Sequence, residues 1–279
     1  MMVTGRQADV GHAGRVLAVI FDWAGTTVDD GCIAPVRALV ESFRRFDVSV
    51  TEAQARTAMG LAKRDHIRAI GETPAVSRAW RNVHTAAFNE EDVGRIYETF
   101  VQLQPGFVVQ CAEPIAGLLT TLKVLRQRRV RIGSTTGYPR AVMDVLLLAA
   151  ARFGFTPQNV ICEDDVARGR PAPYMALRSM MDLDVWPVSA CVAVDDTAIG
   201  IEAGLNAGMW TVGVVMTGNY VGLTSAQRAA FDRNELSARR QEAYRTLNDA
   251  GAHLVIDSVA DLLPVIDEIE RRLSAGQRP

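Results

Sequence analysis

The chain has 279 residues, of which 48% are hydrophobic and 22% are charged, and its formal net charge is −2. A chain of this length can bury a substantial core and still carry a smaller inserted domain. The balanced charge and the absence of a long basic run argue against nucleic acid or an anionic membrane as the main partner.

The spacing of the cysteines and the lack of long apolar segments indicate the cellular compartment. The four cysteines are scattered without a Cys-x-x-Cys pair, as expected of reduced thiols. Residues 1–14 lack the apolar stretch of a secretory signal peptide, and no segment reaches the ~18 consecutive apolar residues of a membrane span. We therefore expect a cytoplasmic protein with no membrane partner.

Short apolar runs alternate with helical patterns over most of the chain. Helical patterns occur at 115–127, 141–153, 173–181 and 199–207. The runs between them are typical of buried strands, at 16–22, 130–134, 160–162, 190–194, 211–215 and, at the sheet edge, 253–256. Strand–helix alternation at this spacing predicts an α/β fold with a doubly wound parallel sheet.

The interval 32–111 breaks this alternation, because it carries helical patterns and no convincing strand. The predicted helices lie at 34–46, 64–70, 77–88 and 91–101, and Thr51 with Gln54 suits a capping box for one more. An all-helical insertion directly after the first strand would lie over the strand ends. We therefore predict a core of residues 1–31 and 112–279, interrupted by a helical cap domain of residues 32–111.

Four polar signals lie where predicted strands end or helices begin. Asp22 ends the first strand, and residues 134–137 (Ser-Thr-Thr-Gly) end the second. Residues 169–171 (Gly-Arg-Pro) open a helix, and residues 195–197 (Asp-Asp-Thr) follow another apolar run. Ligands of open α/β sheets bind at the carboxyl ends of the strands. Together these residues predict a nucleophilic carboxylate, a phosphoryl-binding cation and a site for a hard cation such as Mg²⁺.

Residues 21–27 (Phe-Asp-Trp-Ala-Gly-Thr-Thr) resemble the first motif of the haloacid dehalogenase superfamily, usually Asp-x-Asp-Gly-Thr. In the phosphatases of that superfamily the second Asp protonates the leaving alcohol, and Ala24 stands in its place. Either the enzyme is impaired or its leaving group needs no acid. A carbon leaving group needs none if an iminium absorbs its electrons, which requires a lysine that forms a Schiff base with a carbonyl.

Lysine is scarce in this chain, and Lys63 lies in the predicted cap. His66 could share a helical face with it and help to move protons during imine formation. Taken alone, the pair is better explained as a surface lysine and a satisfied histidine, but Ala24 reverses that preference. Lys63 must be unprotonated to attack a carbonyl, and desolvation under a closed cap would lower its pKa.

Taken together, the motifs resemble the phosphonoacetaldehyde hydrolase (phosphonatase) family over nearly the whole chain. The matching segments are residues 21–29, 31–35 (Gly-Cys-x-Ala-Pro), 59–66 (Met-Gly-Leu-x-Lys-x-Asp-His), 133–138 (Gly-Ser-Thr-Thr-Gly-Tyr) and 206–213 (Asn-Ala-Gly-Met-Trp-Thr-Val-Gly). The resemblance implies hydrolysis of the C–P bond of phosphonoacetaldehyde to acetaldehyde and phosphate, in 2-aminoethylphosphonate degradation. It also suggests a homodimer formed through the cap.

The resemblance further implies roles for individual residues. Lys63 would form the Schiff base, Asp22 would attack phosphorus to give an aspartyl-phosphate, and His66 would assist. Mg²⁺ would be bound by Asp22, the backbone carbonyl of Ala24, and Asp196. The residues expected to contact the substrate are Cys32, Met59, Thr135, Thr136, Tyr138 and Arg170, with Thr136 preferred among the hydroxyls for the phosphoryl group.

The last motif departs from the superfamily pattern, which reads Gly-Asp-Thr with a second acid four residues after the metal ligand. Here Asp195 replaces the Gly, and Gly200 stands where that acid would be. Either Asp195 supplies the lost charge or metal affinity is reduced, and the sequence leaves both open. The competing interpretations are another phosphatase or dehalogenase on this scaffold, and an inactive binding protein with the same fold.

Overall fold

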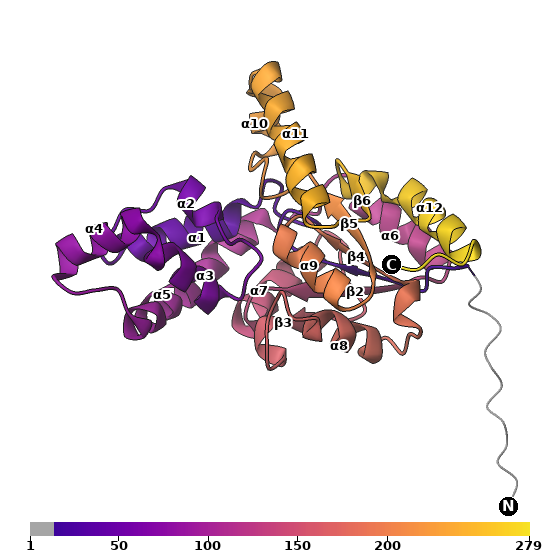
Figure 1. The fold of residues 1–279 in the computed structure, drawn as a ribbon, viewed down its shortest axis with the longest axis horizontal. Helices are drawn as coiled ribbons and strands as arrows, with labels where there is room; N and C mark the ends of the chain where they lie inside the picture. Colours follow the sequence, from indigo (N-terminus) through magenta and orange to yellow (C-terminus); the bar gives the residue numbers. More distant parts are fainter. Residues whose placement is uncertain (1–13) are drawn as a thin grey trace, which may run out of the picture.

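The computed structural model describes residues 14–279, which contain a six-stranded sheet in the order β3-β2-β1-β4-β5-β6 (Figure 1). The strands are β1 (Ala18–Phe21), β2 (Arg131–Thr136), β3 (Ile161–Cys162), β4 (Cys191–Asp195), β5 (Trp210–Val214) and β6 (Leu254–Ile256). Each pair of neighbouring strands is parallel. This confirms the predicted doubly wound α/β fold, with the last strand at the edge.

Helices cover both faces of the sheet. They are α6 (Leu118–Gln127), α7 (Arg140–Ala151), α8 (Tyr174–Asp182), α9 (Ala198–Asn206), α10 (Ser225–Ala230), α11 (Arg233–Asp249) and α12 (Leu262–Ser274). Val19 and Phe21 of β1 pack in a cluster with side chains of α6, α7 and α12, whereas Ala18 and Ile20 pack with α8. Burial on both faces produces the nearly continuous apolar runs seen in the sequence.

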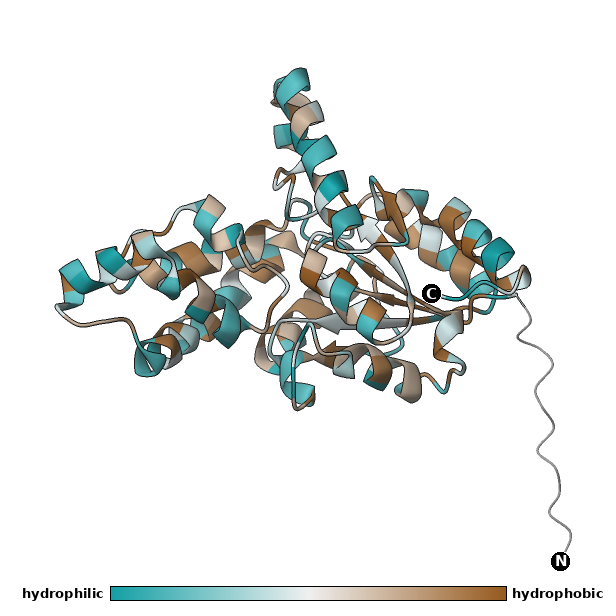
Figure 2. Cartoon of the chain, viewed as in Figure 1, coloured by the Kyte–Doolittle hydropathy of each residue, from teal (hydrophilic) through white to brown (hydrophobic). Residues whose placement is uncertain are grey.

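The helices α10, α11 and α12 were not predicted. In α11, which projects from the body of the molecule and is mostly hydrophilic (Figures 1 and 2), only Ala243 and Leu247 are buried. Its apolar stripe is therefore too narrow to be recognised in the sequence. In contrast, α12 buries Leu262, Ile266 and Ile269 at helical spacing, so its stripe could have been found.

None of the helices within residues 14–279 combines the length and the apolar character needed to cross a membrane.

The first five α-helices after β1 lie together at one end of the molecule (Figure 1, indigo to purple). They are α1 (Ile33–Arg44), α2 (Glu52–Arg56), α3 (Lys63–Glu72), α4 (Pro74–His84) and α5 (Glu90–Val108). Their apolar faces form a core of their own, which includes the fully buried Phe43, Trp80 and Phe100. Thr51 and Gln54 make the predicted capping box at α2. We call these helices the cap, and its boundaries at residues 32 and 111 stay our proposal.

The two connections between the core and the cap run side by side. The Asp29 N–H donates to the Cys111 carbonyl, and Val28 forms a bridge with Pro114. The Asp29 carboxylate also accepts hydrogen bonds from the first N–H groups of α1, where the N-cap residue Cys32 provides no side-chain cap. The start of α1 is therefore attached to the loop that leaves the core.

Candidate active site

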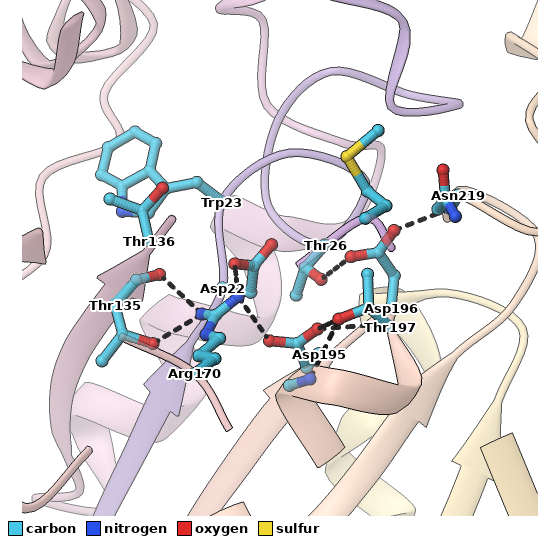
Figure 3. Close-up of polar contacts among 12 residues, drawn as sticks. Asp22, Trp23, Thr26, Thr135, Thr136, Arg170, Asp195, Asp196, Thr197 and Asn219 are labelled. Atoms are coloured by element: carbon cyan, nitrogen blue, oxygen red, sulfur yellow. Dashed lines mark hydrogen bonds and ion pairs between the residues drawn. The ribbon is translucent and has the colours of Figure 1, made fainter. Parts of the chain in front are cut away.

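Three carboxylates converge at the point where the strand order of the sheet reverses. Asp22 directly follows β1, and Asp195 is the last residue of β4, its neighbour in the sheet. Asp196 follows, and ligating oxygens of all three residues lie within 4.8 Å of one another (Figure 3). All three side chains are buried. Open α/β sheets bind their ligands in a crevice at this reversal, so the fold places the carboxylates where chemistry is expected.

Arg170 is a buried cation among these carboxylates (Figure 3). Its Nη1 lies 2.8 Å from Asp22 Oδ1 and 3.2 Å from Asp195 Oδ2. Its Nη2 donates to the carbonyl and the hydroxyl of Thr135, at 3.2 and 2.8 Å. Because both terminal nitrogens are engaged, the guanidinium plane is fixed beside the end of β2.

One guanidinium leaves the three carboxylates with excess negative charge. Burial, followed by the charge of Asp195, raises the pKa of Asp22 to about 7, although Arg170 acts in the opposite direction. Burial also raises the pKa of Asp196, and the charges of Asp22 and Asp195 add to this. Clustered carboxylate oxygens with unbalanced charge are the donors that a small, hard divalent cation prefers. The residues present therefore fit such a cation.

Asp195 occupies the space that a second acid at position 200 would need. Its Oδ1 accepts from the N–H and the hydroxyl of Thr197, at 2.9 and 2.7 Å. A Cβ atom at Gly200 would lie 2.0 Å from Asp195 Cγ, so no larger residue fits there while Asp195 is in place. The packing therefore explains why a glycine at position 200 accompanies an aspartate at position 195.

Asp196 is positioned by the loop after β1 and by the loop after β5. Its Oδ2 accepts from the N–H of Asn219 at 2.7 Å, and its Oδ1 from the hydroxyl of Thr26 at 3.4 Å. A Cβ atom at Gly25, which has a φ of +86°, would lie 2.4 Å from Asp196 Oδ2. Position 25 therefore requires a glycine, because the backbone φ is positive there and a side chain would collide with Asp196.

A small cavity separates this charged cluster from the cap. Nine of the eleven predicted site residues line it. The core contributes Asp22, Ala24, Thr136, Tyr138, Arg170 and Asp196. The cap and the residue just before its first helix contribute Lys63, Met59 and Cys32. The structure thus brings together residues that are up to 174 positions apart (22 to 196) in the chain.

Lys63 is the first residue of α3 and is only 3% exposed. Its Nζ lies 4.0 Å from Met59 Sδ and 5.5 Å from the centre of the Tyr138 ring. Within residues 14–279, no carboxylate forms an ion pair with this amine. Desolvation by burial lowers the pKa of Lys63, and the carboxylate of Glu163 opposes this shift most strongly. This is the direction that we expected for a lysine buried under the cap.

His66, three residues after Lys63 on α3, is fully buried and outside the cavity lining. Its Nε2 is 2.9 Å from the carbonyl oxygen of Ala55, which can only accept, so Nε2 carries the proton. Its Nδ1 has no hydrogen-bond partner within residues 14–279. Burial, and then the charge of Lys63, lower the pKa of His66 to about 3. The imidazole is therefore neutral and offers a free acceptor at Nδ1.

The three hydroxyl residues at the end of β2 have separate environments. Thr136 lines the cavity, as we expected of the preferred phosphoryl ligand. Thr135 lies outside the lining, and its hydroxyl oxygen accepts from Arg170. The Ser134 hydroxyl donates to the carbonyl of Asn159 at 3.0 Å. Thr135 therefore acts on the site through the position of Arg170.

The segment before α3 packs directly on the core. A Cβ atom at Gly60 would lie 2.5 Å from Thr197 Oγ1, and one at Gly137 would lie 2.9 Å from the carbonyl oxygen of Leu61. The cavity between the core and the cap measures about 30 Å³. This is room for about two water molecules, so we expect the cap to move away from the core when a substrate enters.

Several contacts between the cap and the core were not foreseen. Arg56 of α2 donates to the carbonyl of Gly31 at 3.0 Å, to Asn219 Oδ1 at 3.2 Å and to the carbonyl of Gly222 at 3.2 Å. Glu163, directly after β3, accepts from the backbone N–H of Lys63. These partners are 25 to 166 residues apart in the chain, and no local pattern in the sequence indicates such pairs.

The sequence matches the haloacid dehalogenase-like hydrolases over residues 16–208. Together with the fold and the buried aspartates, this match shows that the chain belongs to the haloacid dehalogenase-like hydrolase family and is an enzyme of the hydrolase class. A β-phosphoglucomutase from Clostridium difficile, 18% identical with a TM-score of 0.66 over 92% of this chain and 98% of that one, shares the fold.

Closer relatives share one name. The phosphonoacetaldehyde hydrolase of Salmonella gallinarum is 47% identical over 95% of this chain and 99% of its own length. That of Vibrio campbellii is 45% identical over 95% and 98%. The crystal structure of a phosphonoacetaldehyde hydrolase-like protein from Oleispira antarctica is 43% identical and covers both chains completely, with a TM-score of 0.94. The resemblance noted in the sequence is confirmed at this level.

Proposed function

We propose that this enzyme hydrolyses the C–P bond of phosphonoacetaldehyde to acetaldehyde and phosphate, as a step in 2-aminoethylphosphonate degradation. One observation carries the proposal: a desolvated amine, Lys63, lines the same small cavity as Asp22 and Arg170. Ala24 lines it too, at the position of the acid that a phosphatase needs. A phosphatase or a dehalogenase has no use for the amine. The shared name of the closer relatives supports the same reaction.

The core side binds the phosphonate end of the substrate. The Arg170 guanidinium offers a fixed positive charge, and the hydroxyl of Thr136 donates to a phosphoryl oxygen. In this proposal Mg²⁺ is held by Asp22, the Ala24 carbonyl and Asp196, with Asp195 adding charge. When bound, the ion offsets the negative charge of the phosphonate and so permits the approach of a carboxylate.

The cap side binds and activates the aldehyde end. Because burial lowers the pKa of Lys63, more of this residue is present as the free amine that attacks the aldehyde carbon. Loss of water then gives an imine, and its protonated form withdraws electrons from the neighbouring carbon. His66 assists in this proposal: its ring stays neutral, and its Nδ1, which has no partner within residues 14–279, can accept a hydrogen bond from the amine as it adds. Met59, Cys32 and Tyr138 surround this end and exclude water.

Cleavage then transfers phosphorus to the core side. The Asp22 carboxylate attacks phosphorus, and the electron pair of the C–P bond moves into the iminium to leave an enamine on Lys63. Protonation of the enamine carbon and hydrolysis of the imine release acetaldehyde. Water hydrolyses the aspartyl-phosphate and releases phosphate. The leaving atom is carbon and its electrons are absorbed by nitrogen, so Ala24 removes no necessary acid.

The test is reductive trapping combined with a product assay. The chain has two lysines, Lys63 and the exposed Lys123, which serves as an internal control. Purified protein with Mg²⁺ should release equal amounts of acetaldehyde and phosphate, and borohydride should attach the substrate's two-carbon unit to the Lys63 peptide alone. Phosphate release without an adduct would mean that the C–P bond breaks without an imine and would refute the role of Lys63. Neither product nor adduct would leave a phosphatase or dehalogenase with another substrate, or an inactive binding protein.

The proposal extends to assembly and compartment. We propose a homodimer formed through the cap, on the family resemblance. The apolar stripe of α1 packs in the cap core, with Leu39 and Phe43 fully buried, so a dimer would use another face of the cap. The molar mass in solution, measured by light scattering, tests this. All four cysteines are free, which supports a reducing compartment, and we propose the cytoplasm.

A further inference from the structure

The helix that carries Lys63 lacks a cap residue of its own. Ala62 is the N-cap residue of α3, and no side chain within the cap satisfies the first N–H groups of that helix. Such groups need an acceptor when they are buried. The Lys63 N–H instead donates to Oε2 of Glu163 at 2.7 Å. Glu163 belongs to the core, in the short helix η3 (Glu163–Asp165) that follows β3.

This bond joins the two halves of the molecule at the catalytic lysine. When the cap moves away from the core, Lys63 N–H and the Glu163 carboxylate must separate, so the bond exists only in the closed state. A carboxylate at a helix N-terminus makes a charge-assisted hydrogen bond and also interacts favourably with the helix dipole. Close packing accompanies the bond, since a Cβ atom at Gly169 would lie 3.1 Å from the Cβ of Ala62.

We propose that Glu163 is a positioning residue, which binds the first turn of α3 in the closed state and thereby holds the Lys63 amine over the cavity. The inference rests on the proposed function, because it assigns Glu163 a part in imine formation. Glu163 does not line the cavity, so it acts on the substrate only through Lys63.

Electrostatics gives Glu163 a second, separable effect on the same lysine. Burial raises the pKa of Glu163 to about 7, while the charge and the N–H of Lys63 lower it. In return, ionised Glu163 raises the pKa of Lys63 more than any other charge does. Cys32 and Asp22 act in the same direction, and Arg170 opposes them. The other titratable or charged groups around Glu163 are Arg64, Asp65, Arg68, Tyr97, Asp164 and Arg168.

Two substitutions separate the hydrogen bond from the charge. Glu163→Gln keeps a carbonyl oxygen that accepts from Lys63 N–H and removes the charge, whereas Glu163→Ala removes both. The control is Glu90→Gln, which removes an exposed carboxylate that contacts the same helix through Arg68. The readout is the rate of reductive trapping of phosphonoacetaldehyde on Lys63 as a function of pH, with thermal unfolding as the check on folding.

We expect Glu163→Ala to slow trapping about 10- to 100-fold, since small displacements of a reacting group have effects of this order. Glu163→Gln should restore most of that rate and move the rising limb of the pH profile to lower pH, because it removes a charge that favours the protonated amine. Glu90→Gln should match the wild type. If the Ala variant fails to fold, Glu163→Asp decides: it keeps the charge but shortens the side chain, so it should slow trapping without moving the pH profile.

Wild-type rates and pH profile in both Glu163 variants would overturn the inference. Equal losses in both variants with no pH shift would overturn it too, because general damage has that signature. Hydrogen exchange at the Lys63 amide needs no substrate, and it should accelerate in Glu163→Ala and stay slow in Glu163→Gln. If wild-type protein is never trapped but exchange follows this pattern, the proposed function fails and the contact with Glu163 stands.

Discussion

On the core side of the cavity the charged groups contact one another, whereas the ionisable group on the cap side, the Lys63 amine, has no ion-pair partner within residues 14–279. Asp22 and Asp195 both lie within 3.2 Å of Arg170 Nη1. The neighbours of the Lys63 amine are a thioether at 4.0 Å and an aromatic ring with its centre 5.5 Å away. Both environments are buried, so burial alone does not explain the contrast.

The contrast follows from what each side must do in the proposed reaction. A phosphonate brings negative charge and requires fixed positive charge and a cation. An amine that attacks a carbonyl must be neutral, and an environment without carboxylate partners favours that form. A single rigid site could hardly provide both conditions within a few ångströms. The core and the cap, each with an apolar cluster of its own, provide one condition each.

Removal of the amine should have the largest effect. Lys63→Met keeps the length and apolar character of the side chain, and we expect turnover to fall on the order of 10³-fold or more because no imine forms. The melting temperature should be equal to that of the wild type or higher, since an unpaired buried amine disfavours folding. Product release and thermal unfolding measure the two effects. Substantial turnover in this variant would refute the role of Lys63.

A methyl group at position 200 should disturb the core side alone. In Gly200→Ala the new Cβ overlaps Asp195, which must move away from Thr197 and Arg170. We expect a loss of about 1–3 kcal/mol in the free energy of unfolding, together with weaker cation binding and unchanged trapping of Lys63. Chemical denaturation and calorimetry with Mg²⁺ test this. Wild-type cation affinity would show that Asp195 contributes no charge to the site.

An acid at position 24 should slow imine formation on the cap side, because its negative charge raises the pKa of Lys63. In Ala24→Asp the additional carboxylate lines the cavity and favours the protonated form of Lys63. Each unit by which the pKa of Lys63 rises reduces the free amine about tenfold, so we expect trapping at neutral pH to slow by about this factor. The rising limb of the pH profile of the trapping rate should move to higher pH, opposite to its shift in Glu163→Gln. A shift to lower pH would be inconsistent with this electrostatic account.

Cation binding should weaken as the pH falls. Because the pKa of Asp22 is raised to about 7, the carboxylate holds a proton below this pH, and the cation must displace it. We expect the dissociation constant for Mg²⁺ to rise about tenfold per pH unit below 7 and to change little above 8. Calorimetric titration at several pH values measures it. A dissociation constant that stays the same from pH 6 to 8 would place the cation away from Asp22.

The fold could be predicted because most of its elements have clear periodic patterns. The strands are buried on both faces and give continuous apolar runs, and the cap helices carry stripes that pack in a core of their own. The sequence could not reveal α11, whose surface is polar nearly all round. Strand ends were harder to place, since β2 extends two residues beyond its apolar run, to Thr136.

Side chains of the site were predictable where a strand end or a motif positions them. Asp22, Arg170 and Asp196 follow from the sheet, and Lys63 follows from the absence of an acid at Ala24. In contrast, contacts such as Lys63 N–H with Glu163 depend on how the closed cap meets the core. Such contacts join segments 100 residues apart, and their chemistry leaves no local pattern. Only the structure places them.

The most direct test of the account compares the adducts that borohydride fixes on Lys63 in wild type and in Asp22→Asn. If imine formation on the cap precedes phosphoryl transfer on the core, the wild type should yield an ethyl adduct, because the C–P bond breaks before reduction. Asp22→Asn should yield a phosphonoethyl adduct, with phosphorus retained and no phosphate released. Mass spectrometry of the Lys63 peptide distinguishes the two. An ethyl adduct in Asp22→Asn, or no adduct in either protein, would contradict the account.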